Sequence, residues 1–557
     1  MQFFKKISET FKRSKALKVI CLCVVIVAAV LAIGGIVVNK VAESKLRSAL
    51  ANVPGVKIDF KSVNLALLAG NLELTGVEVA LPDTTGTGLS VEGRIDAIKL
   101  EGVDLGGLLK GEARADRLLI KGPQAQVVLP KKDPKKEKQA EESEEAQAAP
   151  SFLKTVALSE LRLEKGSIGL KSLKDRTKVS VKGLAFTVKD IAVALEENRI
   201  EYNDSLYHVA LDSLDMMDAL GLTRIQLGHL STTDAGPIEA VGIHAYNCVK
   251  QEELAEKMGK VSVMWYDAKL DTLRTSAINI PRMVKEEKIN IDNVYLASSD
   301  IVLLQDDRYP PAVPYPTLQE GINTLKMPMM IKQIDARIDD FTFLWQTTPV
   351  NRGAFPMKNV RLALKNVSNA RNNLMQMGIK AGHKNRSNMD MQVNIRNDKQ
   401  ESTSGYMKIN DLEGSRLDGF IRPLFGATAE VNIEKIEGTF KGNKDQMTED
   451  FCMLYKGMKL KAWNDVDAPF KIVAKGSGMV SFLANLAVPD SNPIRAGKEP
   501  KKVQVTFERD PMLPYPSYLI QNLTMGMLRT VLPGGTVRKT KTDAKAKAGS
   551  KENLQKK

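Results

Sequence analysis

The stretch VKIDFKSVNLALLAGNLELTGVEVAL, residues 56–81, alternates apolar and polar side chains along most of its length. Ile58 and Phe60, for example, stand between charged neighbours. A period of two places alternate side chains on opposite faces of a β-strand. Gly70 and Gly76 interrupt the alternation at positions suited to turns. The stretch therefore predicts short antiparallel strands that share one apolar face.

The same alternation returns in two later runs, over residues 156–193 and 329–473. Turn residues such as Gly166 and Gly183 separate successive strands by about ten residues in the second run. One apolar and one polar face recur throughout, which is typical of antiparallel meanders with one side that needs cover. We expect a mainly β protein, with an elongated, curled, groove-like antiparallel β-sheet.

Residues 19–38 carry no charge and are long enough to cross a hydrocarbon core of about 30 Å as a helix. Six Lys or Arg and one Glu precede them within residues 1–18, and dense Lys/Arg marks the cytoplasmic flank. We expect a single transmembrane helix with a cytoplasmic N-terminus and the bulk of the chain beyond the membrane. A cleaved signal peptide is the alternative, but its apolar region is normally shorter.

The net charge of +14 sits mostly at the two ends of the chain. Residues 1–18 carry +5 and residues 538–557 carry +6, which leaves +3 for everything between them. A nearly neutral body does not indicate a groove for phosphates, so we expect no nucleic-acid partner. Basic ends beside a bilayer fit topology signals, anionic headgroups or a solvated tail.

Residues 131–150 contain five lysines and six acids and almost no large apolar side chain. Such a segment cannot bury enough apolar surface to offset the entropy of ordering it. Strand patterning stops before the segment and resumes after it, so we interpret it as a disordered charged loop inside one continuing sheet. A true interdomain linker is the alternative.

Near the C-terminus, Ser517 is a candidate N-cap for a helix over residues 517–532, which Pro533 would stop. This helix would cap the core or touch another membrane or partner. The basic segment 536–557 would follow it as a disordered tail.

No motif indicates an enzyme, a cofactor or a metal site. The four histidines fit no zinc or triad spacing, and there is neither a glycine-rich phosphate loop nor a nucleophile elbow. Outside the apolar segment the chain has two cysteines, Cys248 and Cys452. They would form a disulfide in an oxidising compartment or stay as two separate buried thiols.

Several segments together resemble the AsmA-like proteins of bacterial envelopes, which are related to the repeating β-groove, bridge-like lipid transfer proteins. The resemblance rests on an N-terminal anchor followed by VNLALLAGNLELTGVEVAL (63–81), IDAIKLEGVDLGGLLKGEARADRLLIKGPQAQVVLP (95–130) and VALSELRLEKGSIGLKS (156–172). Two late segments, GFIRPLFGATAEVNIEKIEGTFKGN (419–443) and VTFERDPMLPYPSYLIQNLTMGMLRTVLPGG (505–535), are also similar to that family.

The resemblance covers an N-terminal β region over 40–195 and a C-terminal β region over 329–535. The middle, 196–328, departs from the family pattern and is interpreted as an embellishment. What the resemblance implies is an inner-membrane protein with its bulk in the periplasm, whose sheet forms a trough with an apolar lining. Its implied partners are phospholipid or another envelope lipid, the inner membrane, and envelope or outer-membrane proteins.

Acyl chains are a natural filler for an open apolar trough. The candidate lining consists of the alternate apolar positions of the first two runs: Val56, Ile58, Phe60, Leu161, Leu163, Ile168, Val179, Val181, Leu184 and Phe186. An ordinary sandwich core made by the same side chains is the competing interpretation. We therefore expect a non-enzymatic protein that binds or conducts lipid in envelope and outer-membrane homeostasis, with a structural or assembly scaffold for envelope proteins as the alternative.

Overall fold

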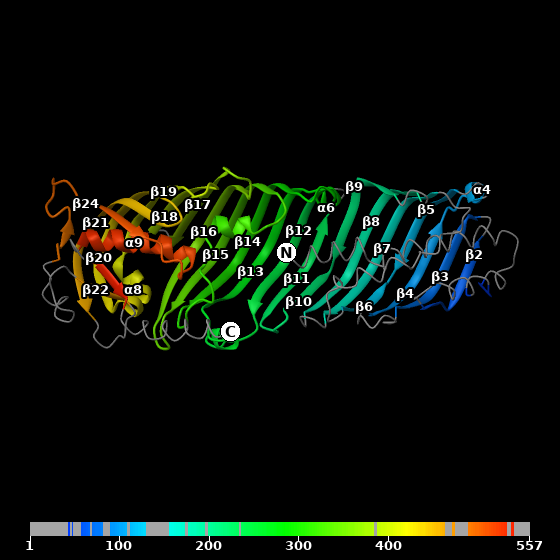
Figure 1. The fold of residues 1–557 in the computed structure, drawn as a ribbon, viewed down its shortest axis with the longest axis horizontal. Helices are drawn as coiled ribbons and strands as arrows, with labels where there is room; N and C mark the ends of the chain where they lie inside the picture. Colours follow the sequence, from blue (N-terminus) through cyan, green and yellow to red (C-terminus); the bar gives the residue numbers. More distant parts are fainter. Residues whose placement is uncertain are drawn as a thin grey trace. The chain divides into compact units, whose positions relative to one another are not determined.

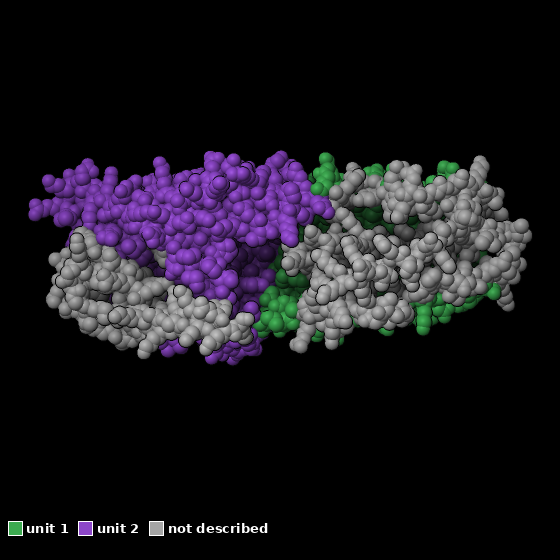
Figure 2. All heavy atoms as spheres, viewed as in Figure 1, with its two compact units in different colours: residues 1–244, 274–286 green, residues 245–273, 287–557 purple. Residues whose placement is uncertain are grey.

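A computed structural model describes the fold (Figure 1). It describes residues 43–44, 47, 57–66, 69–81, 90–108, 112–129, 155–172, 177–194, 199–232, 236–383, 387–462, 470–473, 488–531 and 536–539. The chain divides into two compact units, coloured separately in Figure 2. Unit 1 comprises residues 1–244 and 274–286, and unit 2 comprises residues 245–273 and 287–557. The boundaries fall inside the predicted middle region, and the domain limits proposed from the sequence stay predictions.

The protein is mainly β: of the residues that the structure describes, strands hold 66% and helices 12%. This confirms the predicted fold class in its coarse form. The predicted transmembrane helix, residues 19–38, lies outside the described residues, as do the charged segment 131–150 and most of the basic tail. Within the described ranges, no helix combines the length and the apolar character needed to cross a bilayer.

Unit 1 contains the first eleven strands and most of the twelfth, with short helices at two connections (Figure 1). The elements are β1 (Lys57–Asp59), β2 (Ser62–Ala66), β3 (Asn71–Leu81), β4 (Ser90–Glu101), α4 (Leu105–Leu108), β5 (Glu112–Lys121), β6 (Gln124–Leu129), β7 (Thr155–Ser172), β8 (Lys178–Ala194), β9 (Arg199–Leu211), β10 (Ser213–Met217), β11 (Thr223–Thr232), β12 (Pro237–Asn247) and α6 (Ile280–Glu286).

Unit 2 contains most of β13 and all later strands, together with the remaining helices. Its elements are α5 (Leu254–Lys257), β13 (Val263–Ala277), β14 (Ile289–Asp306), α7 (Leu318–Asn323), β15 (Met329–Gln346), β16 (Arg352–Ser368), β17 (Leu374–His383), β18 (Ser387–Arg396), β19 (Thr403–Glu413), the 3₁₀ turn η3 (Gly414–Leu417), α8 (Asp418–Phe425), β20 (Ala427–Gly442), β21 (Gln446–Ala462), β22 (Phe470–Val473), β23 (Ser491–Asn492), β24 (Lys502–Glu508), α9 (Tyr515–Val531) and β25 (Thr536–Lys539).

Most neighbouring strands are antiparallel, as the sequence predicts, but each unit also contains a parallel step. In unit 1, β5 and β6 both pair with β4 antiparallel and with β7 parallel. In unit 2, β14 pairs with β15 parallel along its whole length. The prediction of a purely antiparallel sheet is therefore wrong at these two places. Parallel neighbours need a crossover connection, which strand alternation alone does not reveal.

The two parallel steps have similar dimensions. In unit 2, β14 and β15 have 18 residues each and β16, the next strand, has 17. In unit 1, β7 has 18 residues and β8 has 17, and β5 pairs with the first part of β7 and β6 with its last part. In each unit a long strand thus has a parallel neighbour on one side and an antiparallel neighbour on the other. The crossover of unit 2, residues 307–328, carries α7.

Helices cover the apolar face of the sheet in unit 2. The helix α9 packs Leu523, Met527 and Val531 against a cluster that includes Phe451 and Met453. Further along, Tyr518 of α9 packs in a second cluster with side chains from the strands β16, β17, β18, β20 and β21. The shorter helix α8 places Phe420 beside Trp345 and Phe355, with ring centroids 6.2 and 5.8 Å apart. The predicted C-terminal helix is therefore present, over Tyr515–Val531.

Ser517 is not the N-cap of this helix. The helix begins at Tyr515, and the backbone N–H of Ser517 donates to the carbonyl of Pro514 at 2.9 Å. Pro516 occupies the second helical position, where a missing N–H costs nothing because the first N–H groups of a helix have no partner within it. The Ser517 hydroxyl is buried and has no hydrogen-bond partner among the described residues.

Candidate functional site: the apolar face of unit 1

Strand register places the candidate lining residues of β7 and β8 on one face of the sheet. Leu163 lies directly opposite Phe186, and Ile168 lies directly opposite Val181. Directly opposed residues of antiparallel strands point to the same side. Leu161 and Val179 continue the same two rows. We call this side of the sheet in unit 1 the lining face.

Leu184 needs a separate explanation, because it lies three residues after Val181 and simple alternation would put the two on opposite faces. Between them Gly183 adopts φ +66°, and the register shifts at this point. A Cβ at Gly183 would lie 2.0 Å from a carboxylate oxygen of Asp212, so only glycine fits. The irregularity adds one residue to the strand and brings Leu184 opposite Gly166, on the lining face.

At the other end of unit 1, Ile58 of β1 is opposite Val79 of β3, which puts it on the face that Leu72 and Leu74 occupy. Phe60 follows β1 and is only 4% exposed. Val56 lies outside the described residues. The predicted lining residues that are described therefore belong to one apolar face in both runs.

Burial divides these residues into two groups. Phe60 belongs to a packed core cluster in unit 1, and Ile58, Leu161 and Leu163 pack against it. The remaining members are half-buried, and none of the core clusters formed by described residues includes them: Ile168, Val179, Val181, Leu184 and Phe186. The first group behaves as an ordinary core, whereas the second presents partly accessible apolar surface.

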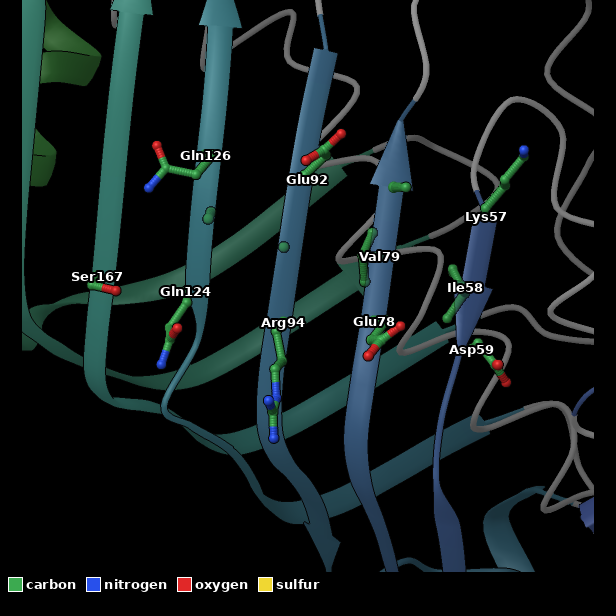
Figure 3. A pocket seen from close by; sticks show the side chains of 13 residues that line it. Lys57, Ile58, Asp59, Glu78, Val79, Glu92, Arg94, Gln124, Gln126 and Ser167 are labelled. Carbon is green, nitrogen blue, oxygen red and sulfur yellow. The ribbon is translucent and has the colours of Figure 1, made fainter.

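A hollow of about 550 Å³ lies over the strands β1, β3, β4, β6 and β7 and is lined by 13 residues (Figure 3). The strand register forms a polar row across it, in which Glu78 is opposite Arg94 and Arg94 is opposite Gln124. Glu78 is next to Val79 in β3, so its side chain points to the face opposite the lining face. Its register neighbours Arg94 and Gln124 point to the same side as Glu78. Of the predicted lining, only Ile58 borders this hollow. The hollow is thus distinct from the half-buried part of the lining face.

A buried polar centre in unit 2 was not predicted. Asp307 accepts hydrogen bonds from the Ser262 hydroxyl at 2.7 Å, from Gln305 at 2.8 Å and from the Trp345 indole at 2.8 Å. The Tyr315 hydroxyl lies 2.8 Å from Ser262 Oγ, and burial raises its pKa. The side chains of Ser262, Gln305 and Trp345 thus bond to the Asp307 carboxylate, and Tyr315 bonds to Ser262. The arrangement stabilises the ends of β13, β14 and β15 and contains no histidine that would activate Ser262 as a nucleophile.

The two cysteines among the described residues are both free. Cys248 is exposed and Cys452 is half-buried, so the predicted alternative of two buried thiols is wrong for Cys248. Burial raises the pKa of the Cys452 thiol. Within the described ranges, no group of three His, Cys, Asp or Glu side chains could hold a metal ion.

Glu449 is the most unusual titratable residue that sequence reasoning missed. It is 0% exposed, and neither carboxylate oxygen has a hydrogen-bond partner in the described part of the chain. Burial raises the pKa of Glu449 to about 8. The sequence does carry a signal, because Glu449 falls in phase with Met447, Phe451 and Met453 in the alternation of β21. A charged residue at an apolar position marks a constraint that packing alone does not explain.

Comparison with models of known protein families finds no match, and comparison with curated proteins finds none either.

Proposed function

We propose that this chain is an AsmA-like protein that is anchored in the bacterial inner membrane and binds or conducts lipid in the periplasm. The proposal combines the sequence resemblance with the properties of the lining face. It assigns no catalytic residue, cofactor or metal. The lipid class is a phospholipid or another envelope lipid with acyl chains.

One observation carries the proposal: the half-buried apolar rows on β7 and β8. Ile168 opposite Val181 and Leu170 opposite Val179 form contiguous rows that belong to none of the core clusters among the described residues. Contiguous accessible apolar surface in a protein marks an interaction site for a ligand, a membrane or a partner. Acyl chains match a surface that has aliphatic and aromatic side chains and no charge.

The energetic gain from covering this surface is substantial. Full burial of one large apolar side chain is worth about 1.5–3 kcal/mol, so completing the burial of a half-buried one is worth about 1 kcal/mol. Ile168, Val179, Val181, Leu184 and Phe186 together would thus contribute on the order of 5 kcal/mol to binding an acyl chain. This gain is counted relative to exposure of the same side chains to water, and it favours a face that an acyl chain covers over one left open.

A scaffold that docks envelope proteins remains the second candidate, and packing in unit 1 supplies its support. Phe60, Leu158 and Leu100 are each less than 9% exposed and make an ordinary core at one end of the lining face. If the rest of the face packs against a protein in the same manner, no lipid is needed.

Site-specific photo-crosslinking of the full chain in cells distinguishes the two candidates. A photoreactive amino acid at Val181 faces the lining side, and the same amino acid at Ser180 faces the other side and serves as the matched control. The proposal predicts lipid adducts at Val181 that mass spectrometry identifies, and none at Ser180. Protein adducts without lipid at Val181 would favour the scaffold and refute lipid binding.

A further inference from the structure

Glu449 lies on the face of unit 2 that the helix α9 covers. In β21 it alternates in phase with Met447 and Phe451, which are 0% and 1% exposed and belong to the clusters under α9. Across the strands it is opposite Phe440 of β20 and Val505 of β24, both of which are buried. A fully buried acid in such surroundings is expensive unless it is neutral or has a partner.

The helix α9 runs along β21, and two contacts fix its alignment. At one point the ring of Tyr518 packs against Phe507 with centroids 5.2 Å apart, and Phe507 is the register partner of Met447. At the other point Gly526 approaches the ring of Phe451 so closely that a Cβ would lie 2.5 Å from it.

The spacing of these contacts places Asn522 over Glu449. Each step of four residues along a helix rises about 6 Å, and each step of two residues along a strand rises about 6.7 Å. Tyr518, Asn522 and Gly526 therefore match Met447, Glu449 and Phe451 step for step. Asn522 is 2% exposed, and its side-chain oxygen has no hydrogen-bond partner in the described part of the chain.

In its neutral form Glu449 can satisfy the buried side-chain oxygen of Asn522 without placing a charge in the apolar interior. A neutral carboxylic acid donates a hydrogen bond to an amide oxygen, whereas a carboxylate only accepts. Burial raises the pKa of Glu449 to about 8, with a smaller contribution from Asp450, so the acid is neutral below that pH. The side chain of Glu449 is thus held in its donor form.

No described group on the neighbouring elements offers Glu449 a compensating positive charge. The facing positions of β20 and β24 are apolar, and Asp450 is negative and points to the opposite face. From α9, the titratable neighbour is the phenol of Tyr518, whose pKa is also raised by burial. Arg509 lies beside Tyr515, at the start of the helix, with its guanidinium 5.9 Å from that ring.

We propose that Glu449 and Asn522 form a proton-dependent latch that holds α9 on the sheet of unit 2. With the proton in place, the carboxylic acid donates to the Asn522 oxygen and satisfies both groups. When the proton is lost, an ionised carboxylate is left in an apolar interior with no positive charge beside it, and α9 is released from Phe451 and Met453. Release would expose the apolar face of unit 2, whatever ligand or partner then occupies it.

The direction of the pH dependence follows from the two states of the helix. Released, Glu449 ionises near its ordinary value of 4.5, and docked it ionises near 8. Between these values the released state loses a proton that the docked state keeps, so docking weakens as pH rises from about 5 to 8. The docking equilibrium is expected to fall by up to about tenfold per pH unit in this window and to level off above it.

Hydrogen–deuterium exchange of the full chain tests the latch. Peptides covering residues 515–531 are followed between pH 5 and pH 8, with protection factors corrected for intrinsic exchange. Wild-type protection of α9 is expected to fall by up to about tenfold per pH unit relative to peptides from β17 and β18. Glu449→Gln cannot ionise, so its α9 protection is expected to be independent of pH. Glu508→Gln, which changes an exposed acid at the end of β24, serves as the matched control and is expected to behave like wild type.

A second variant protects the test against a folding defect in Glu449→Gln. Asn522→Leu removes the acceptor and is expected to loosen α9 at pH 5.5, while at pH 8.5 the latch is already open and wild type and variant converge. The proposal is overturned if wild type and Glu449→Gln show the same pH dependence. It is equally overturned if Asn522→Leu changes α9 protection by the same factor at both pH values.

Discussion

Replacing Gly526 by alanine provides a sensitive test of how α9 is seated in unit 2. Two opposing effects act at this position. Alanine is the better helix former and would stabilise an exposed helix interior by about 1 kcal/mol. The added Cβ, however, would lie 2.5 Å from two ring carbons of Phe451, which is 1% exposed and cannot move without disturbing its cluster.

The steric term outweighs the propensity term. Forcing an extra carbon into a well-packed core costs about 1–3 kcal/mol, and a contact of 2.5 Å requires the helix to shift. We expect Gly526→Ala to lower the free energy of unfolding by about 1–2 kcal/mol. The matched control is Gly321→Ala in α7, where a Cβ would meet nothing within 4 Å. This control is expected to be neutral or to raise stability by up to about 1 kcal/mol.

Urea unfolding of the full chain, followed by tryptophan fluorescence, measures both variants. Trp345 is a suitable reporter because it packs in a cluster with Leu513 and Ile520, next to and within α9. Replacing Phe451 by leucine in the Gly526→Ala background should recover part of the loss, because it removes the clashing ring. If Gly526→Ala stabilises the protein as much as Gly321→Ala does, the close packing of α9 against Phe451 is refuted.

Three further predictions concern other parts of the chain. First, the free energy of unfolding of Glu449→Gln should lie near the wild-type value at pH 4.5. Its excess over wild type should then grow by about 1 kcal/mol for each pH unit up to pH 7.5, because only the wild-type folded state retains a proton there. Parallel pH profiles of the two proteins in urea titrations would contradict this. Second, Cys248 should react with a maleimide faster than Cys452, since it is exposed and burial raises the pKa of Cys452; peptide mass spectrometry gives the two rates, and equal rates would refute the assignment. Third, Thr317→Ala should cost about 1–2 kcal/mol, because Thr317 caps α7 in a capping box with Glu320 and its hydroxyl also donates to Glu401; a change below about 0.3 kcal/mol in urea unfolding would show that the cap does not contribute.

The period-two pattern was sufficient to predict the strands and their apolar face. Ile58, Leu163 and Val181 lie on the face that alternation assigns to them, because side-chain direction in a strand depends on local geometry alone. The C-terminal helix was also predicted, with its start two residues late, because Pro516 initiates the helix ahead of the apparent cap Ser517. Local signals thus predicted which elements are present, but they predicted the first and last residues of those elements less accurately.

Features that depend on distant segments were not predictable in the same way. The parallel pairing of β14 with β15 requires the chain to return along the sheet through residues 307–328, and nothing in the alternation specifies that path. The position of Leu184 depends on the irregularity at Gly183. Strict alternation would have placed Leu184 on the opposite face, and only its apolar character indicated the lining face. Glu449 was visible as an acid in an apolar phase, but its burial becomes apparent only once α9 covers it.

The half-buried rows on β7 and β8 are the basis of the proposed function, and lipid retention tests them most directly. The measurement is mass spectrometry of lipids that copurify with residues 41–535, expressed in the periplasm and purified with little detergent. We expect about one phospholipid molecule or more per chain, lost in Val181→Asp and retained in Ser180→Asp, whose side chain points to the other face. A well-folded chain without lipid, or equal retention in the two variants, would contradict lipid binding on the lining face.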